Sequence, residues 1–174
     1  IEFNYSFFGS SGQINDEIKI DGKIIKCKNY EGLNYCKFKS WAKLLLQQKT
    51  GLRELLSLDL IVDVGGGDSY SDIYGEERFH TINSTKILAK YFRKKIIMFP
   101  QTIGPFSNEK IEKLSFKILK KVDLIFARDD QSFFYIEKQI IDKKLINSID
   151  CAFFLPYNLN YFQNNNVNVG LNVS

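Results

Sequence analysis

The chain has 174 residues, of which 44% are hydrophobic and 25% are charged, and its formal net charge at pH 7 is +4. This length suits one well-cored domain and is marginal for two. The basic residues are spread along the chain without a dense block, which argues against nucleic-acid binding, because a nucleic-acid footprint is usually a clustered positive patch.

Cysteine and histidine usage narrows the possible sites further. Cys27, Cys36 and Cys151 are odd in number and widely spaced, which favours reduced, buried thiols in a cytosolic compartment over a disulfide framework or a zinc site. His80 is the only histidine, which excludes His-rich metal sites and paired-histidine acid/base schemes within this chain. We expect no metal site and no cofactor. No run approaches the roughly 18 apolar residues that span a bilayer, and no signal peptide is recognised in a chain that begins with Ile1.

The N-terminal part of the chain carries weak patterns. Residues 1–8 are aromatic-rich and could form a strand or the tail of a preceding element. Residues 18–28 alternate about the turn dipeptide Asp21-Gly22, which suits a hairpin or an irregular excursion. Apolar residues at helical spacing predict a helix at 38–48 and a shorter helical piece at 52–58.

From residue 60 onward, predicted strands alternate with predicted helices. Short apolar runs indicate the strands, and apolar residues at three- and four-residue spacing indicate the helices. The strands are 60–64, 95–99, 123–127 and 145–151, and the helices between them are about 77–94, 108–121 and 130–139. Alternation at this spacing predicts right-handed βαβ units and therefore an α/β fold with a doubly wound, Rossmann-like parallel sheet.

The end of the chain changes in composition. An Asn-rich stretch at 164–166 precedes a further predicted strand at 167–173. We therefore predict a Rossmann-like N-terminal domain at 1–163, followed at 164–174 by a linker and the first strand of a second domain. An added strand on the first domain is the alternative for 167–173.

Three loops that follow predicted strands should meet at the carboxyl edge of the sheet, where open α/β proteins bind ligands. The first contains Gly65, Gly66 and Gly67, whose backbone can adopt positive φ and lets a bulky ligand approach closely. The second, at 100–106, is held by two prolines around a glycine. The third begins at Arg128, whose planar guanidinium can bind phosphate or carboxylate bidentately. Together these loops favour an anionic ligand, phosphate in particular.

Arg128 is the charged candidate of this site, and its position after a strand leaves two interpretations open; the catalytic role depends on the resemblance described below. Its guanidinium supplies a fixed positive charge but stays protonated, so it cannot be the general acid. The alternative is a surface arginine paired with Asp129 or another carboxylate. The predicted substrate-binding residues are Gly65, Gly66, Gly67, Asp68, Tyr70, Gln101, Gly104 and Ser132.

Some of these residues also have a structural explanation. Gln101 could hydrogen-bond within its own loop, and Ser132 could steady the turn at Arg128. Tyr70 and Tyr74 could stack on a sugar from an exposed loop. Two acids outside the predicted site have structural roles as well: Asp63, inside an apolar strand, is predicted to anchor a neighbouring loop, and Asp150 to tie its strand to the loop that follows.

Four segments, in this order along the chain, resemble the polysaccharide pyruvyl transferase family: 59–75, 100–106, 127–132 and 150–156. The resemblance covers roughly residues 55–174. It implies an enzyme that moves a pyruvyl group from phosphoenolpyruvate onto two hydroxyls of a sugar, as a ketal, and releases phosphate. It also implies a role in the synthesis of cell-surface polysaccharide.

The resemblance further implies two Rossmann-like domains facing a cleft, as in one class of glycosyltransferases, with this chain as the N-terminal half. Arg128 would hold the phosphate or carboxylate of the donor, and the glycine run would line the cleft. Further basic groups, including a histidine, are expected in the second domain, so we expect the 174 residues to be inactive alone. The general acid would come from that domain or from a carboxylate such as Asp68 or Asp72.

Two other functions stay open, a nucleotide-sugar-dependent glycosyltransferase of similar build and a non-catalytic binding module. The resemblance implies phosphoenolpyruvate and a saccharide as partners, and the spread of the basic residues argues against nucleic acid. It places the protein in the cytoplasm, with peripheral association at the inner face of the membrane.

Overall fold

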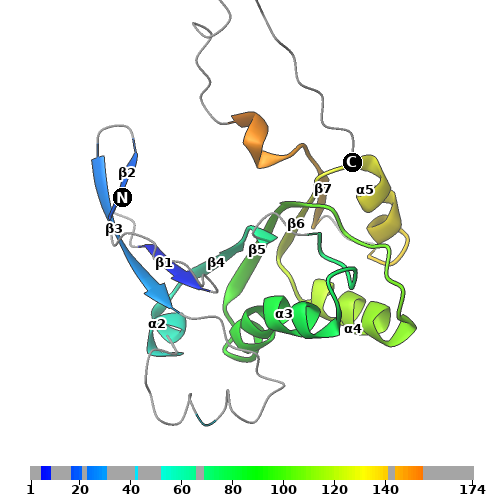
Figure 1. Ribbon diagram of the computed structural model, residues 1–174, viewed down its shortest axis with the longest axis horizontal. Coiled ribbons are helices and arrows are strands. Elements are labelled where there is room, and N and C mark those ends of the chain that lie inside the picture. The colour runs from blue at the N-terminus through cyan, green and yellow to red at the C-terminus, as the bar shows by residue number, and fades with distance from the viewer. Residues whose placement is uncertain are drawn as a thin grey trace, which may run out of the picture.

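The computed structural model describes residues 5–8, 17–20, 23–30, 42, 52–65, 69–140 and 144–154 (Figure 1). The strands are β1 (Tyr5–Phe8), β2 (Glu17–Ile20), β3 (Lys23–Tyr30), β4 (Leu60–Asp63), β5 (Lys95–Gln101), β6 (Leu124–Ala127) and β7 (Leu145–Asn147). The helices are α2 (Leu52–Ser57), α3 (Glu76–Tyr91), α4 (Glu109–Leu119), α5 (Asp130–Glu137) and the 3-10 helix η2 (Cys151–Phe154).

Part of the sequence prediction lies outside the described residues. This applies to all but residue 42 of the helix predicted at 38–48, and to the linker and strand predicted at 164–174. The domain boundary at residue 163 therefore stays a prediction. Cys151 is a free and exposed thiol, which corrects the expectation that it is buried. Among the described residues, no helix is both long and apolar enough to cross a membrane.

A four-stranded parallel sheet forms the centre of the molecule. Its strand order is β4-β5-β6-β7, and helices α3, α4 and α5 provide the three connections in turn. This confirms the prediction of an α/β, Rossmann-like fold with a parallel sheet. The fourth strand is shorter than predicted, because it ends at Asn147 and the chain then forms the 3-10 helix η2.

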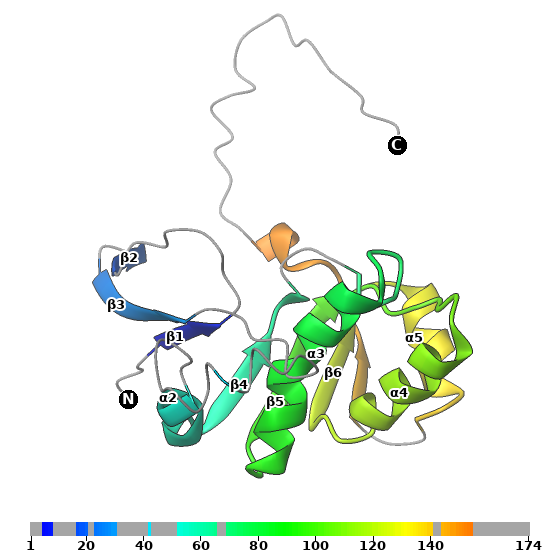
Figure 2. The same ribbon diagram turned by 60° about the horizontal axis from the view of Figure 1, so that its bottom comes forward.

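The described helices α3, α4 and α5 cover one face of this sheet. The strands follow one another across the sheet in chain order, and right-handed crossovers in one direction place their helices on one side. Figure 2 shows α3 in front of β5. The strand side chains on that face are buried with those of the helices: Ile61, Ile96, Met98, Ile125 and Ala127.

The opposite face of the sheet stays partly open to water in the structure. Its exposed apolar side chains come from three strands: Leu60, Val62, Phe99 and Ile146. Parallel sheets are normally buried on both faces. The second helical layer of a doubly wound sheet is thus not among α3, α4 and α5.

The N-terminal strands form a separate small sheet with the order β1-β3-β2. Strand β1 runs parallel to β3, and β2 pairs with β3 in the antiparallel direction. The two residues between β2 and β3 are Asp21 and Gly22, so the predicted hairpin is confirmed. The hydroxyl of Ser6 in β1 donates to Oε1 of Glu54 in α2 at 2.7 Å.

Two helices begin at capping side chains directly after the loops of the predicted site. The Asn108 side chain accepts hydrogen bonds from the backbone N–H groups of Lys110 and Ile111, at 2.9 and 3.4 Å. The Asp129 carboxylate accepts from the backbone N–H of Ser132 at 2.7 Å. Each cap satisfies otherwise unpaired donors and fixes where the helix starts relative to the sheet edge.

We predict that the two sheet faces differ in their contribution to stability. Ile125→Ala, on the helix-covered face, is expected to lower the free energy of unfolding by about 2–5 kcal/mol, because it leaves a cavity in the core. Ile146→Ala is the matched control on the open face and should cost about 1 kcal/mol or less, since 40% of its surface already meets water. Urea unfolding measures both, and equal costs would show that the open face is as well packed as the covered one.

Candidate functional site

The three loops predicted to form a site do meet at the carboxyl edge of the sheet. The backbone N–H of Tyr70 donates to the carbonyl of Thr102 at 2.7 Å, and the N–H of Gly104 donates to the carbonyl of Tyr70 at 3.0 Å. The N–H of Arg128 donates to the carbonyl of Gln101 at 3.1 Å. Backbone hydrogen bonds therefore join the loops after β4, β5 and β6 into one unit.

A buried ion pair lies beneath this unit. The Lys86 ammonium in α3 is 2.6 Å from Oδ2 of Asp63 at the end of β4, and the Lys86 side chain is 2% exposed. The Gln101 amide donates to the carbonyl and to Oδ2 of Asp63, both at 3.1 Å, and the Gly65 N–H donates to Oδ1 at 3.2 Å. Asp63 therefore anchors the glycine loop and β5, as the sequence predicted.

The partners of Asp63 also decide its charge state. Burial raises the pKa of this carboxyl, but the Lys86 ammonium and the hydrogen bonds from Lys86, Gln101 and Gly65 outweigh burial, so the pKa lies below its ordinary value. Asp63 is thus an ionised structural group. Gln101 is buried and bonded to Asp63, so its hydrogen bond reaches the neighbouring strand rather than its own loop, and its amide faces the protein interior.

Gly65 has to be glycine for two reasons. Its φ is +66°, and a Cβ at this position would lie 2.6 Å from Oε1 of Gln101. A side chain here would displace the amide that holds β5 to β4. The other glycines of the run, Gly66 and Gly67, lie outside the described residues, as does Asp68, so their predicted contact with a substrate stays a prediction.

Tyr70 is a core residue, which corrects the expectation that its ring stands on an exposed loop. The ring is fully buried and packs against Phe79 and Phe106, with centroid separations of 5.7 and 6.2 Å. Its hydroxyl donates to Oδ1 of Asn83 at 2.8 Å. A ring enclosed in this way cannot stack on a sugar in this structure, whereas the neighbouring Tyr74 is exposed.

Asp72 ties the glycine loop to the start of α4. Its carboxylate accepts from the backbone N–H groups of Ser107 and Asn108, at 3.0 and 2.8 Å, and from the Ser107 hydroxyl at 2.9 Å. Burial raises the pKa of Asp72, but these hydrogen bonds outweigh burial and lower it. A carboxyl that is ionised and fully bonded is a poor proton donor, which argues against Asp72 as the general acid.

Gly104 and Ser132 support the second loop from inside. Gly104 has φ +71°, and a Cβ there would lie 2.6 Å from the Tyr135 ring. The buried Ser132 hydroxyl oxygen accepts from the backbone N–H of Ile103 at 2.8 Å. The steadying role predicted for Ser132 is thus seen in the structure, and direct contact of either residue with a substrate stays a prediction.

Arg128 differs from these residues because its charged group reaches the surface. The side chain is 27% exposed, and its Nε and Nη2 donate to Oγ1 of Thr102 at 3.0 and 2.7 Å. Its Nη1 donates to Oδ2 of Asp150 at 3.0 Å. The Thr102 hydroxyl in turn donates to Oδ2 of Asp129 at 3.0 Å. The guanidinium is therefore held in a defined plane at the carboxyl edge of the sheet.

The sequence did not single out Thr102 or Lys86, although both organise this edge. Thr102 lies inside the loop at 100–106, and its position between the two prolines was the sequence feature that could have identified it. Lys86 lies in a predicted helix, where a lysine is normally solvated. Within the part of the chain that the structure describes, no group of histidine, cysteine and acidic residues is arranged to hold a metal ion.

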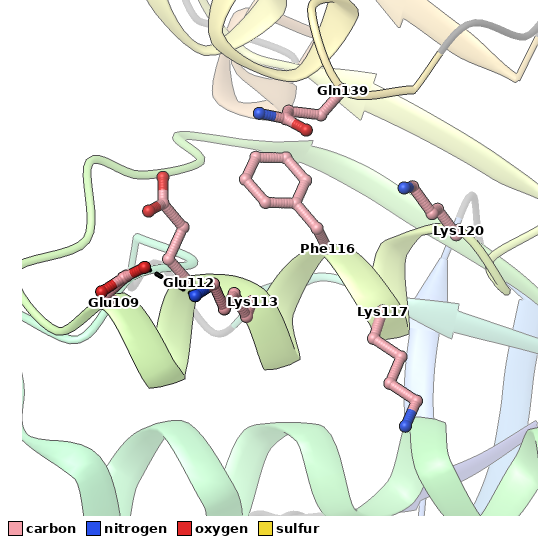
Figure 3. Close-up of a pocket in the computed structure, with 7 residues that line it drawn as sticks. All are labelled: Glu109, Glu112, Lys113, Phe116, Lys117, Lys120 and Gln139. Carbon is pink, nitrogen blue, oxygen red and sulfur yellow. Dashed lines mark hydrogen bonds and ion pairs between the residues drawn. The ribbon is translucent and has the colours of Figure 1, made fainter.

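The molecule also has a pocket of about 420 Å³ beside α4 (Figure 3). None of the residues predicted for the site lines it. Figure 3 shows its two glutamates near one end and Lys117 and Lys120 near the other, with the Lys113–Glu109 pair, at 2.6 Å, at the acidic end. The lining residues are Glu109, Glu112, Lys113, Phe116, Lys117, Lys120 and Gln139. The pocket is therefore separate from the Arg128 edge.

We predict that Lys86→Met destabilises the protein and changes the effect of pH on its stability. The Asp63 carboxylate, whose side chain is 19% exposed, would lose its counter-charge but keep its hydrogen bonds from Gln101 and Gly65, so the cost near neutral pH should be at most the roughly 3–5 kcal/mol of a broken buried pair. In the wild type the folded pKa of Asp63 is lowered, so its contribution is present above the unfolded pKa of about 4 and is lost as pH falls through the folded value. In the variant, burial raises the folded pKa of Asp63 above its unfolded value. The contribution of Asp63 to the free energy of unfolding then falls as pH rises past about 4.

Urea unfolding at pH 4 and pH 7 measures this change. Lys113→Met is the matched control, because the Lys113–Glu109 pair is exposed and worth about 0.5 kcal/mol or less. The cost of Lys86→Met should be larger at pH 7 than at pH 4. Equal costs at the two values would show that Lys86 acts through packing alone.

Comparison with known proteins gives the chain a family. The profile of the polysaccharide pyruvyl transferase family matches residues 12–172. The amylovoran biosynthesis protein AmsJ of Erwinia amylovora is 30% identical over 112 residues, which are 63% of this chain and 25% of AmsJ. The chain thus spans about a quarter of the length of this curated relative. No solved structure matches the chain. The chain belongs to the polysaccharide pyruvyl transferase family.

Proposed function

We propose that this chain forms the donor-binding side of an enzyme that transfers a pyruvyl group from phosphoenolpyruvate to a saccharide. The group would be joined to two sugar hydroxyls as a ketal, with release of phosphate. Family membership and the name of the relative AmsJ, which refers to amylovoran biosynthesis, support a role in polysaccharide biosynthesis. The observation that carries the proposal is the Arg128 guanidinium, fixed and partly exposed at the carboxyl edge of the sheet.

The geometry of Arg128 suits a donor with anionic groups. Phosphoenolpyruvate carries a phosphate and a carboxylate, and a guanidinium can hold either one through two parallel hydrogen bonds. The two hydrogen bonds to Thr102 set the guanidinium plane before a ligand arrives, which reduces the ordering cost of binding. Because the side chain is mostly shielded from water, its charge acts on a bound anion more strongly than a solvated one would.

Arg128 would stabilise negative charge on the donor but would not move a proton. Addition of a sugar hydroxyl to the enol carbon requires a proton on the methylene carbon, and guanidinium does not give one up. The lowered pKa of Asp72 makes that carboxyl unsuitable. The proposal therefore assigns the general acid to Asp68 or to a group outside this chain. It also requires a second domain.

The proposal includes the expected partners and location. The donor would be phosphoenolpyruvate, the acceptor a saccharide, and no further cofactor would take part. We place the reaction in the cytoplasm, with peripheral association at the inner face of the membrane, because the product would be a building block of cell-surface polysaccharide. Tyr74, exposed in the loop after Tyr70, offers an aromatic face on which the acceptor sugar could stack.

We predict that the full-length protein releases phosphate from phosphoenolpyruvate when its saccharide acceptor is present. Arg128→Ala should abolish this release. Arg128→Lys keeps the charge but loses the planar donor set, and it should lower kcat/KM by about 100-fold or more. A coupled assay for phosphate measures these rates.

Arg93→Lys is the matched control, because Arg93 follows α3 at the other end of the sheet and is exposed. Its rate should equal that of the wild type. Turnover of Arg128→Ala at the wild-type rate would remove Arg128 from the mechanism. Binding of a nucleotide sugar, with no binding of phosphoenolpyruvate, would favour a glycosyltransferase instead.

A further inference from the structure

We propose that Asp150 is an internal competitor for the anion site of Arg128. An incoming phosphate or carboxylate would replace the Asp150 carboxylate at Nη1 of Arg128, and this exchange would be coupled to the turn η2 that Asp150 begins. The inference rests on the proposed function in one respect, namely that Arg128 binds an anion. It adds a residue that sets how tightly the anion is held.

The hydrogen bonds of Arg128 define where an anion can bind. A guanidinium has five N–H donors. The edge formed by Nε and Nη2 is occupied by Oγ1 of Thr102. The remaining edge, formed by Nη1 and Nη2, is the one that can hold a carboxylate or phosphate bidentately. Asp150 accepts from Nη1 at 3.0 Å, and Nη1 is one of the two nitrogens that a bidentate ligand on this edge would use, so the two carboxyl or phosphate groups compete for it.

The exposure of the Arg128–Asp150 pair keeps the free-energy cost of displacing Asp150 small. The Arg128 and Asp150 side chains are 27% and 39% exposed, and one hydrogen bond joins them. Ion pairs this open to water contribute little to stability. The Lys86–Asp63 pair differs, because its lysine is 2% exposed and its carboxylate has further partners. Of these two ion pairs at the sheet edge, Lys86–Asp63 is therefore structural, whereas Asp150 can be replaced at Arg128 by another anion.

Asp150 also has the charge that a competitor needs. The hydrogen bond from the Ala152 N–H, together with Arg128, lowers the pKa of the Asp150 carboxyl below its ordinary value. The residue is therefore an anion at neutral pH, of the same chemical class as the donor's carboxylate.

The second oxygen of Asp150 connects the site to the chain that follows. Oδ1 accepts from the backbone N–H of Ala152 at 2.9 Å, and the Asp150 carbonyl accepts from the N–H of Phe153 at 3.1 Å. The turn η2 that these bonds start carries two exposed aromatic rings, Phe153 and Phe154. A carboxylate that leaves Arg128 would therefore shift the first residues of this turn.

Titration calorimetry of the 174-residue chain with inorganic phosphate tests the competition, and pyruvate as a second probe shows whether a carboxylate alone suffices. Asp150→Asn removes the charge but keeps a side-chain oxygen for Ala152. It should bind phosphate about two- to fivefold tighter than the wild type, the range that a pair of this exposure allows. Arg128→Gln should bind neither probe.

Asp130→Asn is the matched control for a general change of charge. Asp130 lies at the start of α5, and its Oδ1 accepts from Asn147 instead of Arg128. Its phosphate affinity should equal that of the wild type. An equal gain in Asp130→Asn and Asp150→Asn would overturn the proposal, as would equal affinity in Asp150→Asn and the wild type. Circular dichroism and urea unfolding of each variant confirm that it is folded.

A dye attached to Cys151 reports on the coupled turn, since this thiol is free and exposed beside Asp150. Cys27→Ser and Cys36→Ser leave it as the single labelling site. Phosphate should change the emission of the wild type with the same midpoint as in calorimetry, and should change that of Asp150→Ala much less. Phosphate binding without any emission change would overturn the coupling.

The two proposals fail in different ways. If Arg128→Gln loses phosphate binding while Asp150→Asn equals the wild type, Arg128 remains an anion site and the role of Asp150 is wrong. If Arg128→Gln binds phosphate as the wild type does, the proposed donor site is wrong as well, and so is the competition built on it.

Discussion

The buried ion pair between Lys86 and Asp63 is the interaction on which the carboxyl edge of the sheet depends. It joins α3 to the end of β4, and through Gln101 and Gly65 it also fixes β5 and the start of the glycine loop. A charge withdrawn from water in this way is costly unless all its partners are present. The arrangement of the edge is therefore specified by groups below the surface, and Arg128 is presented on top of that support.

The fold from β4 onward could be predicted because its signals are local. Short apolar runs marked the strands, and the helices predicted at 108–121 and 130–139 begin close to where the structure has them, after the caps Asn108 and Asp129. Two features could not be predicted, because they depend on neighbours far apart in the sequence. Lys86 is buried owing to a carboxylate 23 positions earlier in the chain. Tyr70 follows a glycine run that suggests an exposed loop, yet its ring fills the space between Phe79 and Phe106.

The candidate site shows the same division between position and role. Sequence reasoning placed the three loops at one edge correctly, because parallel strands end on the same side. It assigned substrate contact to Gln101, Gly104 and Ser132, whose described contacts are with the protein itself. A loop that must hold a charged group still needs such support, and glycine or polar residues after a strand serve either purpose. Hydrogen-bond partners and exposure distinguish residues that support the loops from residues that can contact a substrate. Among the described residues predicted for the site, Arg128 is the one whose charged group reaches the surface.

The one-sided cover of the main sheet has a thermal consequence. The apolar side chains on its open face, among them Leu60, Val62 and Phe99, are already partly hydrated in the folded state. The heat capacity change of unfolding follows the apolar area that is newly exposed to water. Side chains that are wet before unfolding add little to it. The stability curve of the described part should therefore be flatter with temperature than that of an equally long sheet packed between two helical layers.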